Sequence, residues 1–324
     1  MAANSGLLRG TPDAYIHENG RTYHGYRAGA YMYPNDEKEK DKMDVFHRLC
    51  EIARGEVLHH APIAYGDRRP PEMGQARILD LGCGTGIWAI DMADRYQQAE
   101  VIGVDLSMIQ PKWIPQNLRF HCADYESEWT LGQNSFDFIH LRHAVGSVSN
   151  YLALFRKVLD HLIPGYGYFE YVDVDIDTRA DDHSLANAPN LLKWQQMMFE
   201  ATASTGKPIQ YDRDIHKYLK DAGFVNIQEQ VIQIPLNPWP EDPQGKEISR
   251  WYQLMMITGI EGMTLGPLHR VYRWPKEDII RLTAEVMREM RSRDIRGYHS
   301  LHIWTAQRPP YSPPRPSPPR RSPN

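Results

Sequence analysis

The chain has 324 residues, a formal net charge of −4 and 41% hydrophobic residues, which is the composition of a globular protein with a sizeable core and no global basic field that would favour nucleic acid. No stretch approaches the roughly 18 apolar residues of a membrane helix, and the start lacks the apolar segment of a secretory signal. The three cysteines, Cys50, Cys83 and Cys122, form neither a disulfide framework nor a zinc motif, which favours a reducing compartment.

The N-terminal part is expected to be an aromatic segment followed by a helix. Residues 1–34 are irregular and contain several tyrosines. We expect them to pack on the core or to close over a ligand as a lid formed by Tyr23 and Tyr26. The stretch 35–54 predicts an amphipathic helix, because a capping Asn or Asp precedes acids in its first turn and apolar residues recur at helical spacing.

From residue 77 short apolar strands alternate with helices, which predicts a parallel sheet covered on both faces. Pro164 and Gly165 end one of these helices, because proline cannot continue it. The expected helices are 86–98, 151–163 and 214–222. The expected strands are 77–82, 100–107, 118–124, 136–142, 166–176, 225–236 and 300–309.

Two stretches, about 178–205 and 237–297, interrupt this alternation and are expected to be helical insertions that cap the ligand end of the sheet. Together with them, residues 35–307 are expected to form one domain. Residues 308–324 are proline-rich and carry four arginines and no acid. We expect this tail to be disordered, either as a solubilising end or as a short nuclear-import or docking segment.

The stretch LDLGCGTGIW places a glycine-rich loop directly after the first strand of the alternation. It lacks the Lys and Ser/Thr of a P-loop, and its third glycine is one residue too early for the dinucleotide fingerprint. The pattern of Asp80, Gly82, Gly84 and Gly86 resembles the signature of class I S-adenosylmethionine (SAM) methyltransferases. This resemblance implies SAM as the cofactor and a Rossmann-like α/β fold, with a seven-stranded sheet whose last strand is antiparallel.

Three acids follow successive strands at the edge where such sheets bind ligands. Asp80 can face the ammonium group of SAM, directly or through water. Asp105, about 20 residues after the glycine loop, can accept hydrogen bonds from the ribose hydroxyls. In the resembled enzymes the residue at the position of Asp124 contacts the adenine amino group, and we expect Tyr125 or Trp129 to stack nearby.

The acceptor of the methyl group is less constrained. The motifs of amino-methylating DNA enzymes, cytosine-5 enzymes and protein arginine methyltransferases are missing. His143 is a weak candidate for a general base, with a structural histidine as the alternative. His140 and His143 have no third ligand at a motif distance, so we expect no metal. A cation-attracting surface and a solvated strand edge are equally open for the acidic run of Glu170, Asp173, Asp175 and Asp177.

Segments outside the cofactor motif carry a narrower resemblance. The stretch ENGRTYHGYRAGAYMYPNDEKEKDKMDVFHRL resembles the LaeA-type methyltransferases of filamentous fungi, as do PLNPWP, RWY, RVYRWP and LHIWTAQRP farther along. The resemblance covers residues 17–308. It implies a nuclear regulator of secondary metabolism and development, with the cytoplasm as a second location and velvet-type proteins as partners. The residues that match the family's motif one by one are Asp80 with the three glycines of the loop, and Asp105.

Three functions remain open at this point. The chain is a regulatory methyltransferase acting on a protein, a biosynthetic enzyme acting on a small metabolite, or an adapter that retains the cofactor fold. An exposed groove beside the acidic strand would favour the first, and a deep apolar pocket under residues 237–297 would favour the second. A blocked site for the sulfonium of SAM would favour the third. Direct methyl transfer to a thioether or a neutral amine needs no dedicated base.

Overall fold

The computed structural model describes residues 15–63 and 73–310. Its helices in chain order are α1 (Glu37–Ala53), α2 (Ile87–Arg95), α3 (Tyr151–His161), α4 (Pro189–Ala203), α5 (Ile215–Ala222), α6 (Pro243–Tyr272) and α7 (Lys276–Arg291), with a 3₁₀ turn at Ser184–Asn187. Its strands are β1 (Tyr15–Glu18), β2 (Arg21–His24), β3 (Arg77–Leu81), β4 (Glu100–Asp105), β5 (Leu118–Cys122), β6 (Phe138–Arg142), β7 (Tyr168–Arg179), β8 (Val225–Pro235) and β9 (Tyr298–Gln307).

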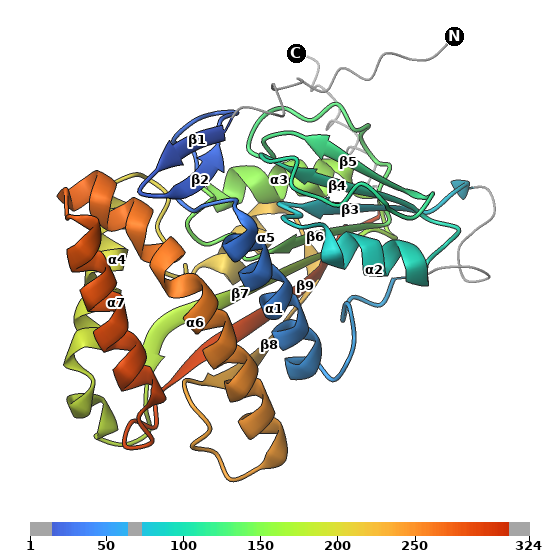
Figure 1. The fold of residues 1–324 in the computed structure, drawn as a ribbon. Coiled ribbons are helices and arrows are strands. Elements are labelled where there is room, and N and C mark those ends of the chain that lie inside the picture. The colour runs from blue at the N-terminus through green and yellow to red at the C-terminus, as the bar shows by residue number, and fades with distance from the viewer. Residues whose placement is uncertain (1–14, 64–72, 311–324) are drawn as a thin grey trace, which may run out of the picture.

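Strands β3 to β9 form one seven-stranded sheet in the order β5-β4-β3-β6-β7-β9-β8 (Figure 1). The first five strands in this order run parallel, and β9 runs antiparallel to both of its neighbours. The expected seven-stranded sheet with an antiparallel last strand is therefore confirmed. All seven strands lie at the positions that the apolar runs indicated, with ends that differ by a few residues.

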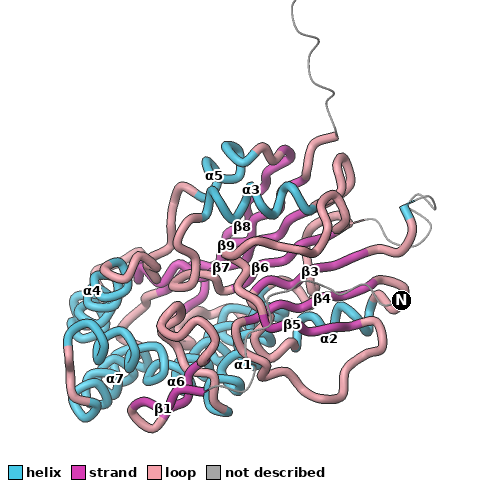
Figure 2. The backbone as a smooth tube through the Cα atoms, turned by 90° about the horizontal axis from the view of Figure 1, so that it is seen from above, coloured by secondary structure: helices cyan, strands magenta, loops and turns pink. Residues whose placement is uncertain are grey.

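Helices cover both faces of the sheet (Figure 2). Helices α1 and α2 lie on one face, and α3 and α5 lie on the other. Alternating side chains of β3 serve the two faces: Ile78 packs with Trp88 of α2, whereas Leu79 belongs to the larger core on the opposite side. Both side chains are fully buried, as expected for a parallel sheet enclosed between helices.

The N-terminal segment is more ordered than the sequence indicated. Instead of being irregular throughout, it contains the hairpin of β1 and β2. Asn19 and Gly20 form its two-residue turn with φ of 54° and 78°, the positive values that a type I′ hairpin requires. Arg21 makes a bidentate ion pair with Asp36, the N-cap of α1, at 2.5 and 2.8 Å. Residues 25–36, which we call the strap, are thus anchored where the hairpin meets α1.

The two insertions are helical, as expected. The first contains α4, and the second contains α6 and α7, which pack on α4. Helix α6 also packs along α1, and its glycines face that contact: a Cβ at Gly259 would lie 2.2 Å from Lys42, and one at Gly266 would lie 2.1 Å from the Met32 carbonyl oxygen. None of the described helices has the length and apolar character needed to cross a bilayer. The expected disordered tail, 308–324, begins too early: Arg308 donates to the carbonyl oxygens of Leu159 and Leu162, and residues 311–324 lie outside the described residues.

Candidate functional site

A pocket opens at the carboxyl edge of β3, β4, β5 and β6, and the strap and α1 form its other wall. Together with its mouth it holds about 1130 Å³ of open space. The wall residues come from segments that are far apart in the sequence, between His24 and Lys207. The pocket therefore exists only when the strap, α1 and the sheet edge are assembled.

The glycine loop forms the floor of this pocket through Gly82 and Gly84. Both have positive φ, and a Cβ at Gly84 would lie 2.9 Å from the Sδ of Met43 on α1. Gly86 does not line the pocket; it begins α2 with φ of 79°, and a Cβ there would lie 2.3 Å from the Phe120 ring. Glycine is thus required here both by the backbone conformation and by close packing.

Asp105 lies at the end of β4 and lines the pocket. Its carboxylate accepts hydrogen bonds from the backbone N–H groups of Gly84 and Ser107, both at 2.9 Å. Burial raises its pKa, and these two bonds oppose that shift by stabilising the anion. A carboxylate can accept about four hydrogen bonds, so capacity remains for the ribose hydroxyls that the sequence assigned to it.

Asp124 and Tyr125 also line the pocket, just after the end of β5. Asp124 accepts from the backbone N–H of Glu126 and forms an ion pair with Arg27 of the strap at 3.2 Å. The Tyr125 ring packs beside Gly82, where a Cβ would lie 3.3 Å from it, and its hydroxyl lies 2.6 Å from Ser147. This end of the pocket therefore offers a carboxylate and an aromatic ring together.

Asp80 does not reach the pocket wall. It is buried, and its carboxylate lies 2.9 Å from Nδ1 of His140, whose ring stacks on Trp88 at 3.8 Å. Burial raises the pKa of Asp80 to about 8. A contact between Asp80 and the ammonium group of SAM stays a prediction, and it would need an intervening water.

The tyrosines that line the pocket are not the pair expected to form a lid. Tyr23 is buried beneath the guanidinium of Arg270, 4.6 Å from its ring centroid, and neither it nor Tyr26 lines the pocket. Tyr31 and Tyr33 of the strap do, with ring centroids 4.9 Å apart. The expectation was wrong about the residues because a strap without periodicity gives no signal about which side chains point inward.

His143 lines the pocket at the end of β6, on the opposite side of β3 from Asp105. Its φ is 59°, a rare value for a residue with a side chain, and its Nδ1 has no hydrogen-bond partner. Burial, helped by the nearby cations Lys42 and Arg142, lowers its pKa to about 3. A general base works best with a pKa near the working pH, so His143 is a poor base. His140 faces Asp80 instead, so the structure gives the two histidines different environments.

The acidic run is neither a cation-attracting surface nor a solvated edge. Strand β7 lies inside the sheet, between β6 and β9. Glu170, Asp173 and Asp175 are buried: Glu170 pairs with Arg54 at 2.5 Å, and Asp173 accepts backbone N–H bonds from the loop after β6. Asp175 and the partly buried Asp177 pair with arginines. Both interpretations failed because strand alternation alone does not report what covers each face.

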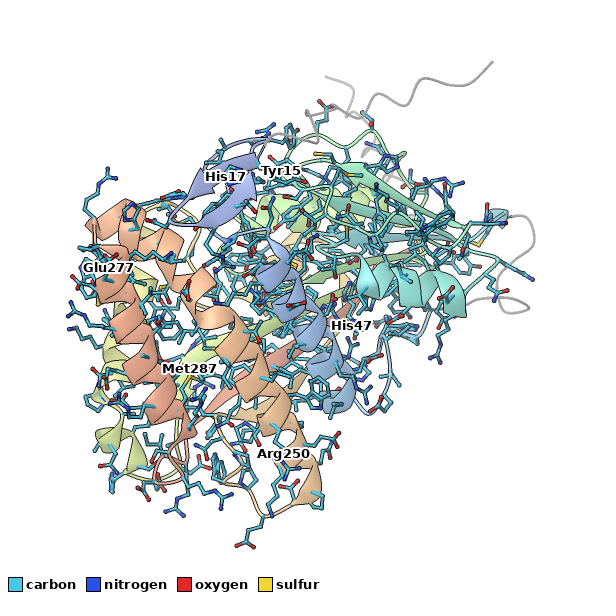
Figure 3. All side chains as sticks on the ribbon, in the orientation of Figure 1. Tyr15, His17, His47, Arg250, Glu277 and Met287 are labelled. Carbon is cyan, nitrogen blue, oxygen red and sulfur yellow. The ribbon has the colours of Figure 1, made fainter. Side chains whose placement is uncertain are left out.

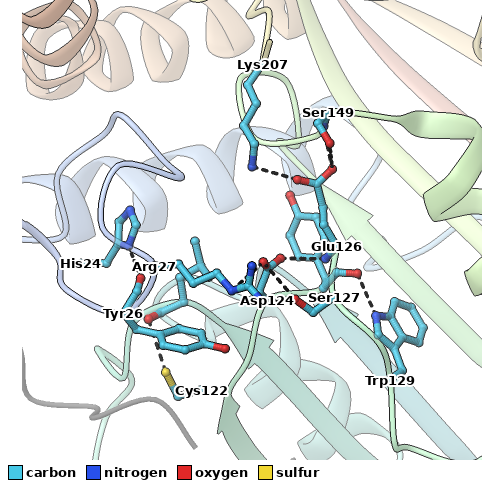
Figure 4. Close-up of polar contacts among 12 residues, drawn as sticks. His24, Tyr26, Arg27, Cys122, Asp124, Glu126, Ser127, Trp129, Ser149 and Lys207 are labelled. Atoms are coloured by element: carbon cyan, nitrogen blue, oxygen red, sulfur yellow. Dashed lines mark hydrogen bonds and ion pairs between the residues drawn. The ribbon is translucent and has the colours of Figure 1, made fainter. Parts of the chain in front are cut away.

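Several residues that line the pocket were not identified from the sequence. Lys42 comes from the buried face of α1, and Tyr31 and Tyr33 come from the strap. Arg142 ends β6 just as Asp105 ends β4, so its position at the ligand edge of a strand could have identified it. Lys207 follows α4 and reaches the pocket through its ion pair with Glu126 at 2.8 Å (Figure 4).

Residues 42–229 match the family described as "Methyltransferase domain". The chain is 50% identical to the secondary metabolism regulator LAE1 of Cochliobolus heterostrophus, over 90% of this chain and 94% of that protein. It is 45% identical to the protein-methionine methyltransferase laeA of Emericella nidulans, over 90% of this chain and 76% of that protein.

A solved structure that resembles the fold is geranyl diphosphate C-methyltransferase from Streptomyces coelicolor, in complex with Mg²⁺, geranyl diphosphate and S-adenosyl-L-homocysteine. It superposes with a TM-score of 0.45 at 16% identity, over 88% of this chain and 92% of that chain. At this sequence identity and TM-score, the similarity does not identify residues of the site.

Proposed function

The chain belongs to the methyltransferase family of LaeA-type secondary metabolism regulators, and from this premise we propose that it methylates the thioether of a methionine side chain in a protein. It is a SAM-dependent methyltransferase with the class I fold. The relative from Emericella nidulans is named for protein-methionine methylation. The observation that carries the proposal for this chain is the weakly basic His143 at the methyl-transfer end of the pocket.

The direction of the cofactor in the pocket follows from the strand order. Asp124 and Tyr125 follow β5, and Asp105 ends β4, which supports a placement of adenine and ribose on that side. The methionyl part of SAM, including its sulfonium, then lies toward β6. There the pocket is lined by His143, Phe46 and Tyr33. The acceptor atom must approach the methyl group among these side chains.

The chemistry of a thioether suits this environment. Its sulfur has a free lone pair at any pH, so the displacement at the methyl carbon requires no proton transfer. The step moves the positive charge from the sulfonium of SAM to the sulfonium of the product. Aromatic faces such as those of Tyr33 and Phe46 can stabilise a cation at close range. Because the pKa of His143 is about 3, an acceptor that must lose a proton, such as a hydroxyl, has no effective base there.

The test uses methyl-labelled SAM with the purified protein and a fungal protein extract. We expect label in protein, and we expect it to be released by warm alkali as a volatile sulfide, which is characteristic of a methylated methionine. Asp105→Ala should abolish the transfer, since it removes the expected ribose acceptor and the hydrogen bonds from Gly84 of the glycine loop and from Ser107. Alkali-stable label in lysine or arginine would contradict the thioether proposal while leaving the methyltransferase assignment intact.

The same experiment separates the other two functions. Label in an extractable metabolite instead of protein would indicate a biosynthetic enzyme; the pocket, however, has no wall residue from the described part of the 237–297 insertion. SAM binding without label in any fraction would indicate an adapter.

Nuclear localisation and velvet-type partners are part of this proposal and are supported by the family of regulators alone. The experiment is affinity capture of the full chain from nuclear and cytoplasmic fractions of the source fungus. Recovery from the nuclear fraction together with a velvet-type protein is expected. Recovery from the cytoplasm without such a protein would contradict it.

A further inference from the structure

The methyl-transfer end of the pocket contains an arginine whose charge is not neutralised. Arg142 ends β6 and lines the pocket. Within residues 15–63 and 73–310, no carboxylate forms an ion pair with its guanidinium. Its contacts are a hydrogen bond to His47, one with the Cys50 thiol, and the Phe46 ring, 5.8 Å from Cζ to centroid. A partly buried guanidinium without an anion is costly, which suggests that a ligand supplies the anion.

The other cation at this end is already paired. Lys42 is 3% exposed, and its ammonium forms an ion pair with the fully buried carboxylate of Glu39, one turn away on α1. Glu39 in turn lies 4.0 Å from Arg21 of the hairpin. Lys42 therefore has its counter-charge inside the protein, whereas Arg142 does not.

SAM carries one anionic group, the carboxylate of its methionyl part. Asp124 comes just after β5, Asp105 ends β4 and Arg142 ends β6. These strands lie in the order β5-β4-β3-β6 in the sheet. Neighbouring strands lie about 4.8 Å apart, so these positions span about three spacings along the sheet edge. An extended SAM with adenine at Asp124 and ribose at Asp105 places its methionyl end toward Arg142.

Two further residues hold the guanidinium in place. Nη1 of Arg142 donates to Nδ1 of His47 at 3.2 Å, and Nε2 of His47 faces Oδ2 of Asp91 at 2.9 Å. An arginine only donates, so Nδ1 must be the acceptor and Nε2 must carry the proton. His47 lies on α1 (Figure 3) and Asp91 on α2, so the chain of bonds ties both helices to the end of β6.

The same cluster could be mistaken for a metal site, because ligand atoms of His47, Glu51 and Asp91 lie within 4.8 Å of one another. The guanidinium on the other ring nitrogen of His47 speaks against a divalent cation there, since like charges at such a distance repel. Positioning of Arg142 explains the geometry without a metal.

We propose that Arg142 binds the carboxylate of SAM and that His47 and Asp91 act as positioning residues for its guanidinium. The inference rests on SAM being the cofactor. A planar guanidinium can bind a carboxylate through two parallel hydrogen bonds, which fixes the methionyl part as well as attracting it. The role of Arg142 is thus to set the position of the sulfonium relative to the acceptor.

The test compares SAM with its decarboxylated analogue, which keeps the sulfonium and the amine, by isothermal titration calorimetry. The parent protein should bind SAM at least about 10-fold more tightly than the analogue. Arg142→Gln should lower the affinity for SAM by about that factor and leave the affinity for the analogue unchanged. Arg142→Lys should recover part of the preference, because it restores the charge but not the fork.

Matched controls separate a specific effect from a damaged fold. Arg281→Gln alters an exposed arginine on α7 that pairs with Asp278 outside the pocket, and it should bind both ligands like the parent. Asp91→Ala, at a partly exposed position on α2, should reduce the preference for SAM to an intermediate value without changing analogue binding. An unchanged preference in Asp91→Ala would overturn the positioning role.

The outcomes also distinguish this inference from the cofactor assignment. If neither ligand binds the parent protein, the assignment of SAM fails. If SAM binds but Arg142→Gln keeps the full preference over the analogue, the proposal for Arg142 is wrong. A preference lost in Lys42→Met and kept in Arg142→Gln would assign the carboxylate to Lys42 and overturn the proposal in the same way.

Discussion

At the scale of single residues, the titratable side chains of the pocket are controlled by burial and by neighbours from distant segments. Asp80 faces His140 in the interior, and its pKa is raised to about 8. His143 is held neutral, with a pKa of about 3. Both shifts have burial as their largest cause. Burial therefore disfavours the charged form of both side chains, Asp80 behind the pocket wall and His143 in it.

His143 makes a prediction about stability and pH. Its pKa in the folded protein is below the ordinary value of 6.5, so below that pH the unfolded chain binds a proton that the folded protein does not. Its contribution is complete above pH about 6.5 and is lost as the pH falls toward about 3. His143→Asn tolerates the left-handed backbone and removes the titration. We expect the variant to lose less stability than the parent on acidification.

Urea unfolding at several pH values between about 7 and 4.5 measures the difference. The slope of the stability difference should approach, but not reach, about 1.4 kcal/mol per pH unit, because 27% of the side chain is exposed. Parallel curves for parent and variant would show that His143 is protonated in the folded protein or equally titratable in both states.

At the scale of elements, the strap is held between the hairpin, α1 and α6. Gly259, Gly262 and Gly266 of α6 recur at spacings of three and four and allow the N-terminal elements to approach its backbone. His24 adds a clamp: Nδ1 lies 2.7 Å from the Tyr26 carbonyl oxygen, and Nε2 lies 3.1 Å from that of Tyr31. The position of the strap beside the pocket is thus determined by elements from opposite ends of the chain.

Gly266→Ala should displace the strap. The new methyl group would lie 2.1 Å from the Met32 carbonyl oxygen, and this neighbour is backbone, which cannot rotate away. We expect a loss of about 1–3 kcal/mol of stability, the usual cost of overpacking, despite the higher helix propensity of alanine. SAM binding should weaken as well, because Tyr31 and Tyr33 move with Met32.

Chemical unfolding and SAM titration measure the two effects. Ile257→Ala, at an exposed position on the same helix, is the control and should leave both quantities near the parent values. Unchanged SAM affinity in Gly266→Ala would separate the strap from cofactor binding.

His24→Leu tests the clamp. It removes the ring nitrogens that face the Tyr26 and Tyr31 carbonyl oxygens, and with them the hydrogen bonding of His24 to the strap, so the segment around Arg27 should open more often. Arg27 is 46% exposed and is a site that trypsin can cleave. We expect cleavage after Arg27 to accelerate at least about 10-fold in the variant, since each lost hydrogen bond contributes about 1 kcal/mol. SAM should slow the cleavage in the parent protein, and equal rates with and without SAM would indicate that the strap does not close over the cofactor.

At the scale of the whole molecule, the helical insertions and the cofactor-binding sheet share one packed structure. Helix α6 runs along α1, α4 contacts β7, and the larger core includes residues from all of these elements. The insertions do not line the pocket themselves; they support α1 and the strap, which do. They act on the site through the elements that they hold in place.

This organisation predicts a single cooperative unfolding transition. Calorimetry and circular dichroism should report the same midpoint, because the insertions cannot unfold without exposing α1. SAM at about a hundred times its Kd should raise the stability of the whole unit by about 2.7 kcal/mol. Two transitions, of which SAM shifts only one, would show that the insertions form a separate folding unit.

Much of this architecture could be predicted from local patterns. Apolar runs of strand length alternate with helices along the chain, and each parallel strand ends at the same edge of the sheet. Asp105 at the end of β4 and Asp124 just after β5 are therefore expected at the ligand-binding edge of the sheet, and both line the pocket there. The glycine loop likewise follows from its spacing, since three positive φ values in five residues exclude other residue types.

The amino-acid sequence by itself thus determined the succession of strands and helices along the chain, the cofactor loop and the positions of Asp105 and Asp124 at strand ends, because these depend on neighbours within a few residues. Only the tertiary structure determined which tyrosines line the pocket, that the acidic run of β7 is buried, and how Arg142, His47 and Asp91 come together. Those contacts join residues that are between 44 and 116 positions apart in the sequence. Their geometry is set by how helices pack on the sheet, and no local periodicity encodes that packing.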